Sequence, residues 1–250
     1  MKWIISILLI TILTAGTFCR NKATTEKLLF SKKNTNSFAL LELFTSEGCS
    51  SCPAADRLLP VLAKGDSGIF VLSFHVDYWD NLGWKDAFCN AAFTERQRNY
   101  AQRFGLESIY TPQLVINGEH EVVGSDQQRA AAFIRQVQNQ NLITNIKINS
   151  VKKENQQLYV DCALDGELKN ISLAAALVQN HAERKIGAGE NRGATLVHTN
   201  VVRSFAEHPA SAQMHFNMQM PAELKDGEWQ LILYAQRKSD LKIIGATRFQ

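Results

Sequence analysis

Two short apolar runs stand out in the first half of the chain. Residues 38–44 are apolar except for Glu42, and residues 69–74 form a second run that contains a single serine. Strands that are covered on both faces show this continuous apolar pattern. The pattern therefore predicts two buried strands, and the first of them leads through two cysteines into a helix-like run.

A helix is predicted in the segment that follows the second strand. Residues 94–97 match a capping box, and Gly105 provides a stop signal. Together they predict a helix of about ten residues. Its solvated face is expected to carry Arg96, Arg98 and Arg103.

A hairpin and a further helix are predicted next. Asn117-Gly118 separates the apolar run 114–116 from the run 119–123, and this dipeptide is the strongest short signal for a tight β-hairpin. Residues 125–128 then open a helix that is expected to reach about residue 138. Its packed side is expected to hold Ala131, Ile134 and Val137.

From about residue 144 the apolar pattern changes to a period of two. Alternating runs cover residues 158–164, 214–220 and 229–233, and no helix pattern of comparable strength occurs among them. Residues 144–250 are therefore expected to form a sandwich of antiparallel strands. Its core should contain Cys162, Met214, Met218 and Met220.

The N-terminus has the pattern of an export signal. Lys2 precedes about ten mostly apolar residues, and small residues follow at positions 14–17. Residues 1–19 are therefore predicted to be a signal peptide, which gives an extracytoplasmic location, periplasmic or secreted. Cys19 leaves lipoprotein anchoring, and with it a membrane tether, as an alternative. The polar residues 20–36 lack apolar periodicity and are predicted to be a tether.

Composition and charge exclude some classes of partner. The chain has 250 residues, of which 45% are hydrophobic and 20% charged, and this suits a folded protein with two modest cores. Its formal net charge of +3 is small, and its Lys and Arg residues are dispersed. Nucleic acid is therefore not expected as a partner.

The candidate chemistry lies where the first strand meets the helix-like run. Cys49 and Cys52 are spaced as C-x-x-C, and the free N–H groups and dipole of a helix N-terminus favour a thiolate over a thiol. A zinc site would need a second ligand pair, and neither another C-x-x-C nor an H-x3–5-H spacing occurs. A disulfide between residues three apart constrains the unfolded chain little. The spacing therefore favours redox chemistry over both structural roles.

The same residues carry a resemblance to known proteins. Residues 38–142 resemble a thioredoxin-like domain, with a strand, a C-S-S-C-P motif at a helix start and the segment 110–118. Residues 43–53, 74–80, 82–86, 93–97 and 110–115 resemble an exported bacterial thioredoxin-like family, domain of unknown function family 1223. The resemblance implies that residues 37–143 form an α/β thioredoxin-like domain that contains a helical insertion. The alternating pattern then predicts that an all-β sandwich-like domain follows at residues 144–250.

The resemblance also implies roles for individual residues. Cys49 is expected to be exposed and to attack a substrate disulfide, and Cys52 to be shielded and to resolve the mixed disulfide. Thr111 and Pro112 match the family's X-cis-Pro segment, whose backbone binds an extended substrate. The expected function is that of an exported thiol–disulfide oxidoreductase without a cofactor. Its partners would be thiols or disulfides of proteins and peptides.

Two further polar residues extend this site. Glu42, an acid within a buried strand, is either a strand-end carboxylate that reaches water or a group that transfers a proton for the cysteines. His75 follows the second strand, at the edge where sites form in α/β sheets. The alternative function is extracytoplasmic metal handling or binding on a thioredoxin-like scaffold. Resemblance to thioredoxin-like copper chaperones, which use a cysteine pair and a histidine, implies that Cys49, Cys52 and His75 would bind Cu(I).

Overall fold

The structure is a computed structural model, and it describes residues 37–250. These residues belong to one compact unit that spans residues 34–250. The expected signal peptide, the polar tether and Cys19 lie outside the described residues. Within the described part, none of the helices has the length and apolar character needed to cross a membrane.

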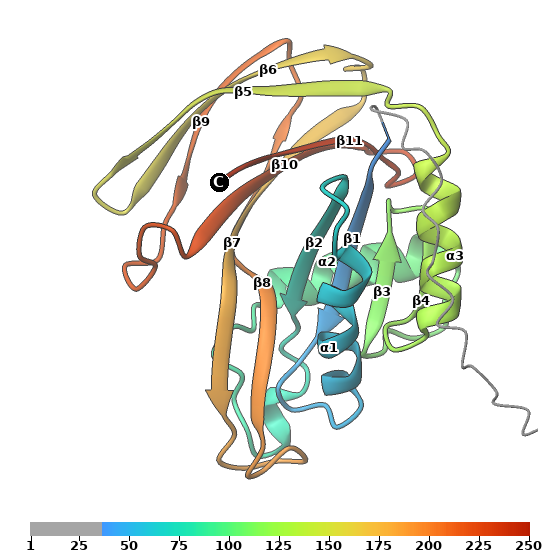
Figure 1. Cartoon of the computed structure of the whole chain (residues 1–250), viewed down its shortest axis with the longest axis vertical. Helices are drawn as coiled ribbons and strands as arrows, with labels where there is room; N and C mark the ends of the chain where they lie inside the picture. The colour runs from blue at the N-terminus through green and yellow to red at the C-terminus, as the bar shows by residue number, and fades with distance from the viewer. Residues whose placement is uncertain (1–36) are drawn as a thin grey trace, which may run out of the picture. The chain divides into compact units, whose positions relative to one another are not determined.

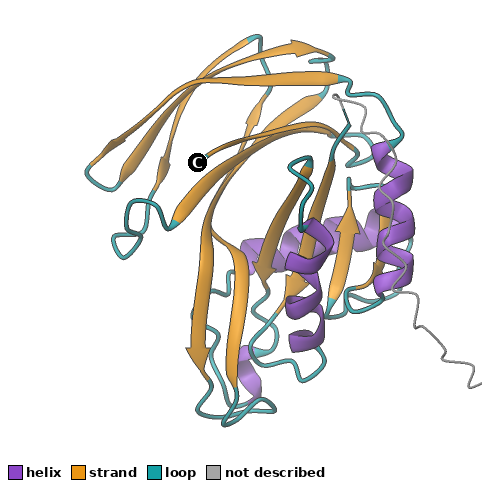
Figure 2. Ribbon diagram, in the orientation of Figure 1, coloured by secondary structure: helices purple, strands orange, loops and turns teal. Residues whose placement is uncertain are grey.

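The first half of the described chain alternates strands and helices (Figures 1 and 2). In order these are β1 (Ala39–Thr45), α1 (Cys52–Ala63), β2 (Ile69–His75), the 3-10 helix η1 (Asp80–Leu82), α2 (Ala91–Phe104), β3 (Gln113–Ile116), β4 (His120–Val123) and α3 (Gln127–Gln138). Every residue of β1 and β2 is buried, so the continuous apolar pattern predicted these two strands correctly.

The second half consists of strands and loops. The strands are β5 (Thr144–Glu154), β6 (Gln157–Gly166), β7 (Ile171–Lys185), β8 (Thr195–Pro209), β9 (Gln213–Gln219), β10 (Trp229–Arg237) and β11 (Ile243–Phe249). β5, β6 and β9 form a separate three-stranded antiparallel sheet. The core between this sheet and one face of β7, β10 and β11 contains the predicted residues Cys162, Met214, Met218 and Met220.

The expected fold class, a thioredoxin-like α/β domain followed by an all-β sandwich, is wrong. One mixed eight-stranded sheet, in the order β11-β10-β7-β8-β2-β1-β3-β4, runs through both halves of the chain. The halves join where β2 pairs in parallel with β8, at Ser73 and Val201. Strands make up 45% of the described residues and helices 19%, so this part of the chain is mostly β. A period of two shows that a segment forms strands, but it does not show which sheet those strands enter.

The two faces of the central strands carry different layers. Leu41 and Leu43 of β1 point to the face that α1 and α3 cover. Leu40 and Phe44 point to the opposite face, where they pack in a core shared with α2, β7, β8 and β10. Because neighbouring residues of a strand point to opposite faces, Glu42 lies on the α2 face, away from α1.

The boundaries of α2 follow its capping residues. The helix begins at Ala91, earlier than predicted, because the Asn90 side chain accepts a hydrogen bond from the Ala92 N–H (2.9 Å). It ends at Phe104, and the predicted stop residue Gly105 caps it in the left-handed conformation (φ 67°) that glycine adopts easily. The expectation that Arg96 lies on the solvated face is wrong, because this side chain is buried against Glu42.

The predicted hairpin and the last helix are confirmed. Asn117 and Gly118 both have positive φ values, 48° and 65°, between β3 and β4. α3 begins after Asp126, whose side chain caps it. Its buried positions are Ala130, Ile134 and Val137, so Ala130 takes the place expected for Ala131.

Candidate functional site

The loop between β1 and α1 carries the two cysteines. Cys52 is the first residue of α1, and its N–H donates to the Cys49 carbonyl (3.3 Å) in the preceding turn. The two sulfurs form a disulfide, and the Ser51 hydroxyl lies 3.3 Å from Cys49 Sγ. Both cysteine side chains have an exposed fraction of 0%, so the expectation of an exposed Cys49 is wrong.

The tip of the β7–β8 hairpin, residues 186–194, is bound to this loop. Asn191 Nδ2 donates hydrogen bonds to the carbonyls of Glu47 (2.8 Å) and Cys49 (2.9 Å). The Glu190 carboxylate accepts the Ser50 N–H (3.0 Å), and hydrogen bonds from Ser50 lower the pKa of this carboxyl. Sequence analysis missed both tip residues, because no local spacing connects positions that lie about 140 residues apart.

Glu47 anchors the loop from the inside. Its fully buried carboxylate accepts hydrogen bonds from Trp84 Nε1 (2.7 Å) and from Arg184 Nε (3.2 Å). Trp84 also packs against the hairpin tip, where a Cβ at Gly187 or Gly189 would lie only 3.0 or 3.1 Å from its side chain. Glycine at these two positions therefore lets the indole approach the backbone of the tip.

Two buried histidines lie beside Glu47. His198 of β8 has Nε2 3.8 Å from Glu47 Oε1 and Nδ1 3.4 Å from Asp56 Oδ2. His75 has Nδ1 2.7 Å from Asp86 Oδ2. The two imidazole rings meet edge to face, with 4.7 Å between their centroids. The site therefore contains a closely packed group of ionisable side chains that has almost no contact with solvent.

His75 and Asp86 shift each other's pKa. Burial alone would lower the pKa of His75, but the Asp86 carboxylate outweighs it and the pKa is raised. Burial alone would raise the pKa of Asp86. The charge of His75 and hydrogen bonds from His75 and from the N–H groups of Glu47 and Phe88 instead lower it to about 2. The pair therefore favours an imidazolium next to a carboxylate.

Asp56 is an acid on the same side of α1 as Cys52. It follows Cys52 by one helical turn, and both lie on the buried face of the helix. Thr45 Oγ1 donates to its Oδ1 (3.1 Å), whereas its Oδ2 has no hydrogen-bond partner in the described structure. Glu42, the acid that the sequence suggested, lies instead on the other face of β1 and accepts from Arg96 Nε (2.8 Å). The i, i+4 spacing from Cys52 is the signal that could have identified Asp56.

Thr111 lies beside the cysteine loop and is connected to it by Trp79. Trp79 Nε1 donates to Thr111 Oγ1 (2.8 Å), and a Cβ at Gly48 would lie 3.0 Å from Trp79 Cβ. Gln97 Nε2 holds the preceding residue through the Tyr110 carbonyl (2.7 Å). Among residues 37–250, neither the N–H nor the C=O of Thr111 takes part in a hydrogen bond, so both are available to a ligand.

Pro112 faces the first turn of α1. The Thr111-Pro112 peptide bond is cis. A Cβ placed at Gly124 would lie 3.1 Å from Pro112 Cβ, 3.0 Å from Ala55 Cβ and 2.8 Å from Leu43 Cδ1. The structure therefore places Thr111 against Trp79, which packs on the cysteine loop, and Pro112 against Gly124, which packs on α1. His75 lies in the adjoining ionisable group, and Glu42 lies on the other face of β1. Among the described residues, no three His, Cys, Asp or Glu side chains are arranged to hold a metal ion.

Two solved structures resemble this fold over most of the chain. A structural genomics target from Agrobacterium tumefaciens has a TM-score of 0.64 and 25% identity, over 86% of this chain and 95% of that one. HBP35 of Porphyromonas gingivalis has a TM-score of 0.58 over 87% of this chain and 76% of that one, and its 12% identity shows likeness of fold alone. No curated protein matches the sequence. The profile described as "Protein of unknown function (DUF1223)" matches residues 40–236, from β1 to β10, and the chain therefore belongs to this family.

Proposed function

We propose that this protein is an exported thiol–disulfide oxidoreductase that acts on proteins or peptides through Cys49 and Cys52. The observation that supports it is the C-x-x-C disulfide at the N-terminus of α1, with Thr111 close to the cysteine loop through Trp79 and Pro112 close to α1 through Gly124. In the reduced protein, the free N–H groups and the dipole of α1 stabilise the Cys49 thiolate. The available backbone groups of Thr111 would bind an extended substrate next to that sulfur.

The exchange takes place in two steps. The Cys49 thiolate attacks one sulfur of a substrate disulfide, whose other sulfur leaves with the bonding electron pair and takes a proton from water. The Cys52 thiolate then attacks Cys49 Sγ, forms the Cys49–Cys52 disulfide and releases the first substrate sulfur as a thiolate. Two electrons thus pass from the protein to the substrate. The reaction is reversible, and the reduction potentials of the two pairs set its direction.

Asp56 supplies the proton transfer that the second step needs. Cys52 is fully buried, so its thiol has no bulk water to which it can release a proton. Asp56 lies on the same face of α1, and its Oδ2 is free of hydrogen bonds in the described structure. Its carboxylate would accept the Cys52 proton as the thiol becomes a nucleophile.

No observation favours the copper-binding alternative. The Nδ1 atom of His75 is bound to Asp86, and the ring packs edge to face against His198. The described residues hold no group of three potential ligands in a metal-binding arrangement. Disulfide exchange therefore remains the single function that we propose.

Trapping of mixed disulfides tests the proposal. A Cys52→Ala variant lacks the resolving sulfur, so Cys49 should stay covalently bound to a cystine-containing peptide and show the added mass. The Cys49→Ala variant should trap nothing. His75→Gln in the Cys52→Ala background should trap as before, because His75 takes no part in the exchange. If no mixed disulfide is trapped, and the protein instead binds stoichiometric Cu(I) that His75→Gln abolishes, copper binding would be favoured over disulfide exchange.

A further inference from the structure

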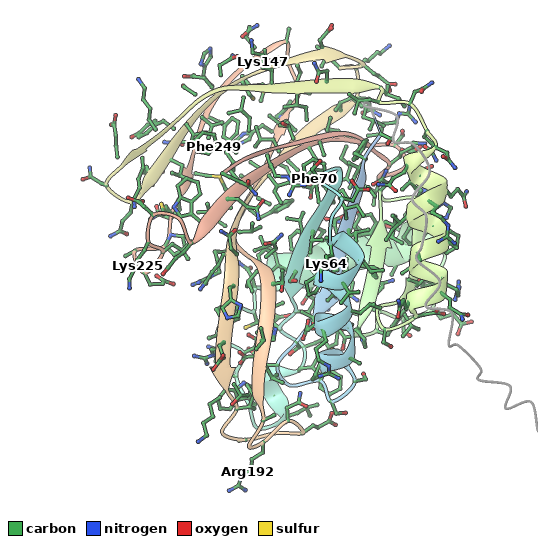
Figure 3. All side chains as sticks on the ribbon, viewed as in Figure 1. Lys64, Phe70, Lys147, Arg192, Lys225 and Phe249 are labelled. Atoms are coloured by element: carbon green, nitrogen blue, oxygen red, sulfur yellow. A yellow bond between two sulfur atoms is a disulfide. The ribbon has the colours of Figure 1, made fainter. Side chains whose placement is uncertain are left out.

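His198 is a buried base without a hydrogen-bond partner. It lies on β8, which packs against α1 and belongs to the hairpin whose tip carries Arg192 (Figures 1 and 3). The His198 side chain has an exposed fraction of 0%, and neither ring nitrogen takes part in a hydrogen bond in the described structure. Leaving a buried polar group unpaired is costly, so such a group in a folded protein calls for an explanation.

The ring of His198 lies between two buried carboxyl groups. Its Nδ1 is 3.4 Å from Asp56 Oδ2, and its Nε2 is 3.8 Å from Glu47 Oε1. A neutral imidazole has one N–H and can donate to only one of these oxygens, whereas an imidazolium can donate to both. Asp56 Oδ2 also has no hydrogen-bond partner of its own. The structure therefore has a place for one further proton between His198 Nδ1 and Asp56 Oδ2.

Asp56 connects this ring to the cysteine pair. It follows Cys52 by one turn of α1, both side chains are on the buried face, and Cβ atoms four residues apart on a helix lie about 5–6 Å from each other. The Thr45 hydroxyl donates to Asp56 Oδ1 (3.1 Å), which leaves Oδ2 free to receive a proton. A proton of the Cys52 thiol can therefore reach the ring through a single carboxyl group.

The neighbouring acids already have basic partners. The Glu47 carboxylate accepts from Arg184 Nε (3.2 Å), and Asp86 Oδ2 is paired with His75 Nδ1 (2.7 Å). Asp56 accepts only from a neutral hydroxyl, so among the described residues it lacks a permanently charged partner. Buried charges are stable when they are paired, and a proton on the adjacent imidazole would supply the missing positive charge.

We infer that His198 takes up, through Asp56, the proton that Cys52 loses in the resolving step. This inference rests on the proposed function. The proton moves from Cys52 Sγ to Asp56 Oδ2 and on to His198 Nδ1. The electron pair left on Cys52 Sγ forms the bond to Cys49 Sγ, and the bond from Cys49 Sγ to the substrate sulfur breaks, so the substrate leaves as a thiolate. When the disulfide is reduced, the proton returns along the same route.

The transfer is favourable because imidazole is the stronger base. An ordinary imidazole binds a proton on the order of a hundredfold more tightly than an ordinary carboxylate. The titratable groups that face the ring are Asp56 of α1, Glu47 of the cysteine loop and His75 of β2, which meets it edge to face. The two carboxylates stabilise the charge of the imidazolium. His198 acts through Asp56 and is therefore a positioning residue for the resolving step.

The test measures the resolving step by itself on the full chain. The reduced protein is mixed with excess dithiobis(nitrobenzoate), and the released thionitrobenzoate is followed by stopped-flow absorbance. The first release forms a mixed disulfide on Cys49, and the second occurs when Cys52 displaces the thionitrobenzoate that remains there. Cys52→Ala identifies the first release. Release from the other cysteines is measured on the double variant Cys49→Ala with Cys52→Ala and is subtracted.

We expect His198→Asn to slow the second release about tenfold or more at pH 7 and to change the first release less than about twofold. Asp56→Asn should slow the second release at least as much. Adding His198→Asn to Asp56→Asn should cost little more, because the ring acts through that carboxyl group. The control is His181→Asn, which changes an exposed histidine on the neighbouring strand β7 and should match the wild type. Circular dichroism confirms that each variant is folded.

The pH profile is a readout that a purely structural role would not move. The wild-type rate of the second release should fall about threefold or more from pH 8 to pH 6, because a protonated imidazole cannot accept a further proton. In His198→Asn this rate should change less than about twofold over the same range, because the group that titrates is absent.

Four results would each overturn the inference. They are an unchanged second release in His198→Asn, equal slowing of both releases, a pH profile that His198→Asn leaves as it is, and an effect of His198→Asn that is equally large with and without Asp56→Asn. Failure of the proposed function gives a different result. In that case the folded wild type shows no second release, and Cys52→Ala releases no more thionitrobenzoate than the double variant Cys49→Ala with Cys52→Ala.

Discussion

Glu42 and Arg96 form an ion pair inside the core, with 2.8 Å between Glu42 Oε1 and Arg96 Nε. The guanidinium carbon of Arg96 lies 5.1–5.7 Å from the ring centroids of four aromatic residues, Phe74, Tyr100, Phe205 and Tyr234. The hydroxyls of Tyr100 and Tyr234 also donate to Glu42. This cluster connects β1, β2, α2, β8 and β10, and so it stabilises the junction between the two halves of the chain.

Arg96→Met should therefore destabilise the protein strongly. It leaves the Glu42 carboxylate buried without a counter-charge, and breaking a buried pair in this way costs about 3–5 kcal/mol. Urea unfolding at neutral pH measures the change. Arg98→Ala, which removes an exposed pair with Glu95, should change the free energy of unfolding by less than about 0.5 kcal/mol. The double variant Arg96→Met with Glu42→Leu should recover much of the lost free energy of unfolding. If it does not, the unpaired Glu42 carboxylate is not the cause of the destabilisation.

The His75–Asp86 pair should make stability depend on pH in two directions. The pKa of His75 is raised from 6.5 in the folded state, so its contribution is full below pH 6.5 and is lost as pH rises through the folded value. The pKa of Asp86 is lowered from 3.8 to about 2, so its contribution is full above pH 3.8 and is lost as pH falls toward 2. The pair should stabilise most between these limits.

Urea unfolding of the wild type and of His75→Gln at several pH values checks this expectation. The difference in free energy of unfolding between the two proteins should be largest at about pH 5 and should shrink on the alkaline side. A difference that stays constant from pH 5 to pH 9 would show that the His75 contribution does not depend on its charge.

Gly124 should tolerate no larger residue, because it separates Pro112 from α1. A Cβ there would meet Leu43 Cδ1 at 2.8 Å and Ala55 Cβ at 3.0 Å. We expect Gly124→Ala to destabilise the protein by about 1–3 kcal/mol, as overpacking does, and to slow disulfide exchange by moving the Pro112 segment. Thermal unfolding and the rate of reaction with the cystine-containing peptide measure both effects. The control is Ser125→Ala, which changes the exposed neighbouring residue. If Gly124→Ala altered neither the thermal stability nor the reaction rate, the segments around Gly124 would have to shift freely.

The free thiol of Cys89 should be inert at neutral pH. Burial, together with the adjacent Asp80 carboxylate that accepts its S–H (2.9 Å), raises the pKa of this thiol to about 12. Iodoacetamide at pH 8 should therefore label Cys89 far more slowly than an unperturbed cysteine, whose pKa is about 8.5. Asp80→Asn should speed the labelling, as measured by peptide mass mapping. Rapid labelling of the wild type would contradict the shielding by Asp80.

Features that depend on neighbouring residues were predictable from the sequence. The two buried strands, the C-x-x-C pair at the start of a helix and the Asn117-Gly118 turn were all recognised from short runs of residues. The core positions of Cys162 and the methionines followed from alternation. Each of these features depends on backbone preference or side-chain period within a few residues, and such information is local.

The sequence by itself thus indicated which segments form strands and helices, and it placed the C-x-x-C sulfurs at the start of a helix. Only the tertiary structure decided that β2 pairs with β8, that Arg96 faces Glu42 and that Asn191 binds the carbonyl of Cys49. An apolar pattern specifies that a face is buried, but not which segment buries it. A charged side chain is likewise expected to be solvated as long as its distant partner in the fold is unknown. The partners here lie 54 to 142 residues apart, so only the folded chain brings them together.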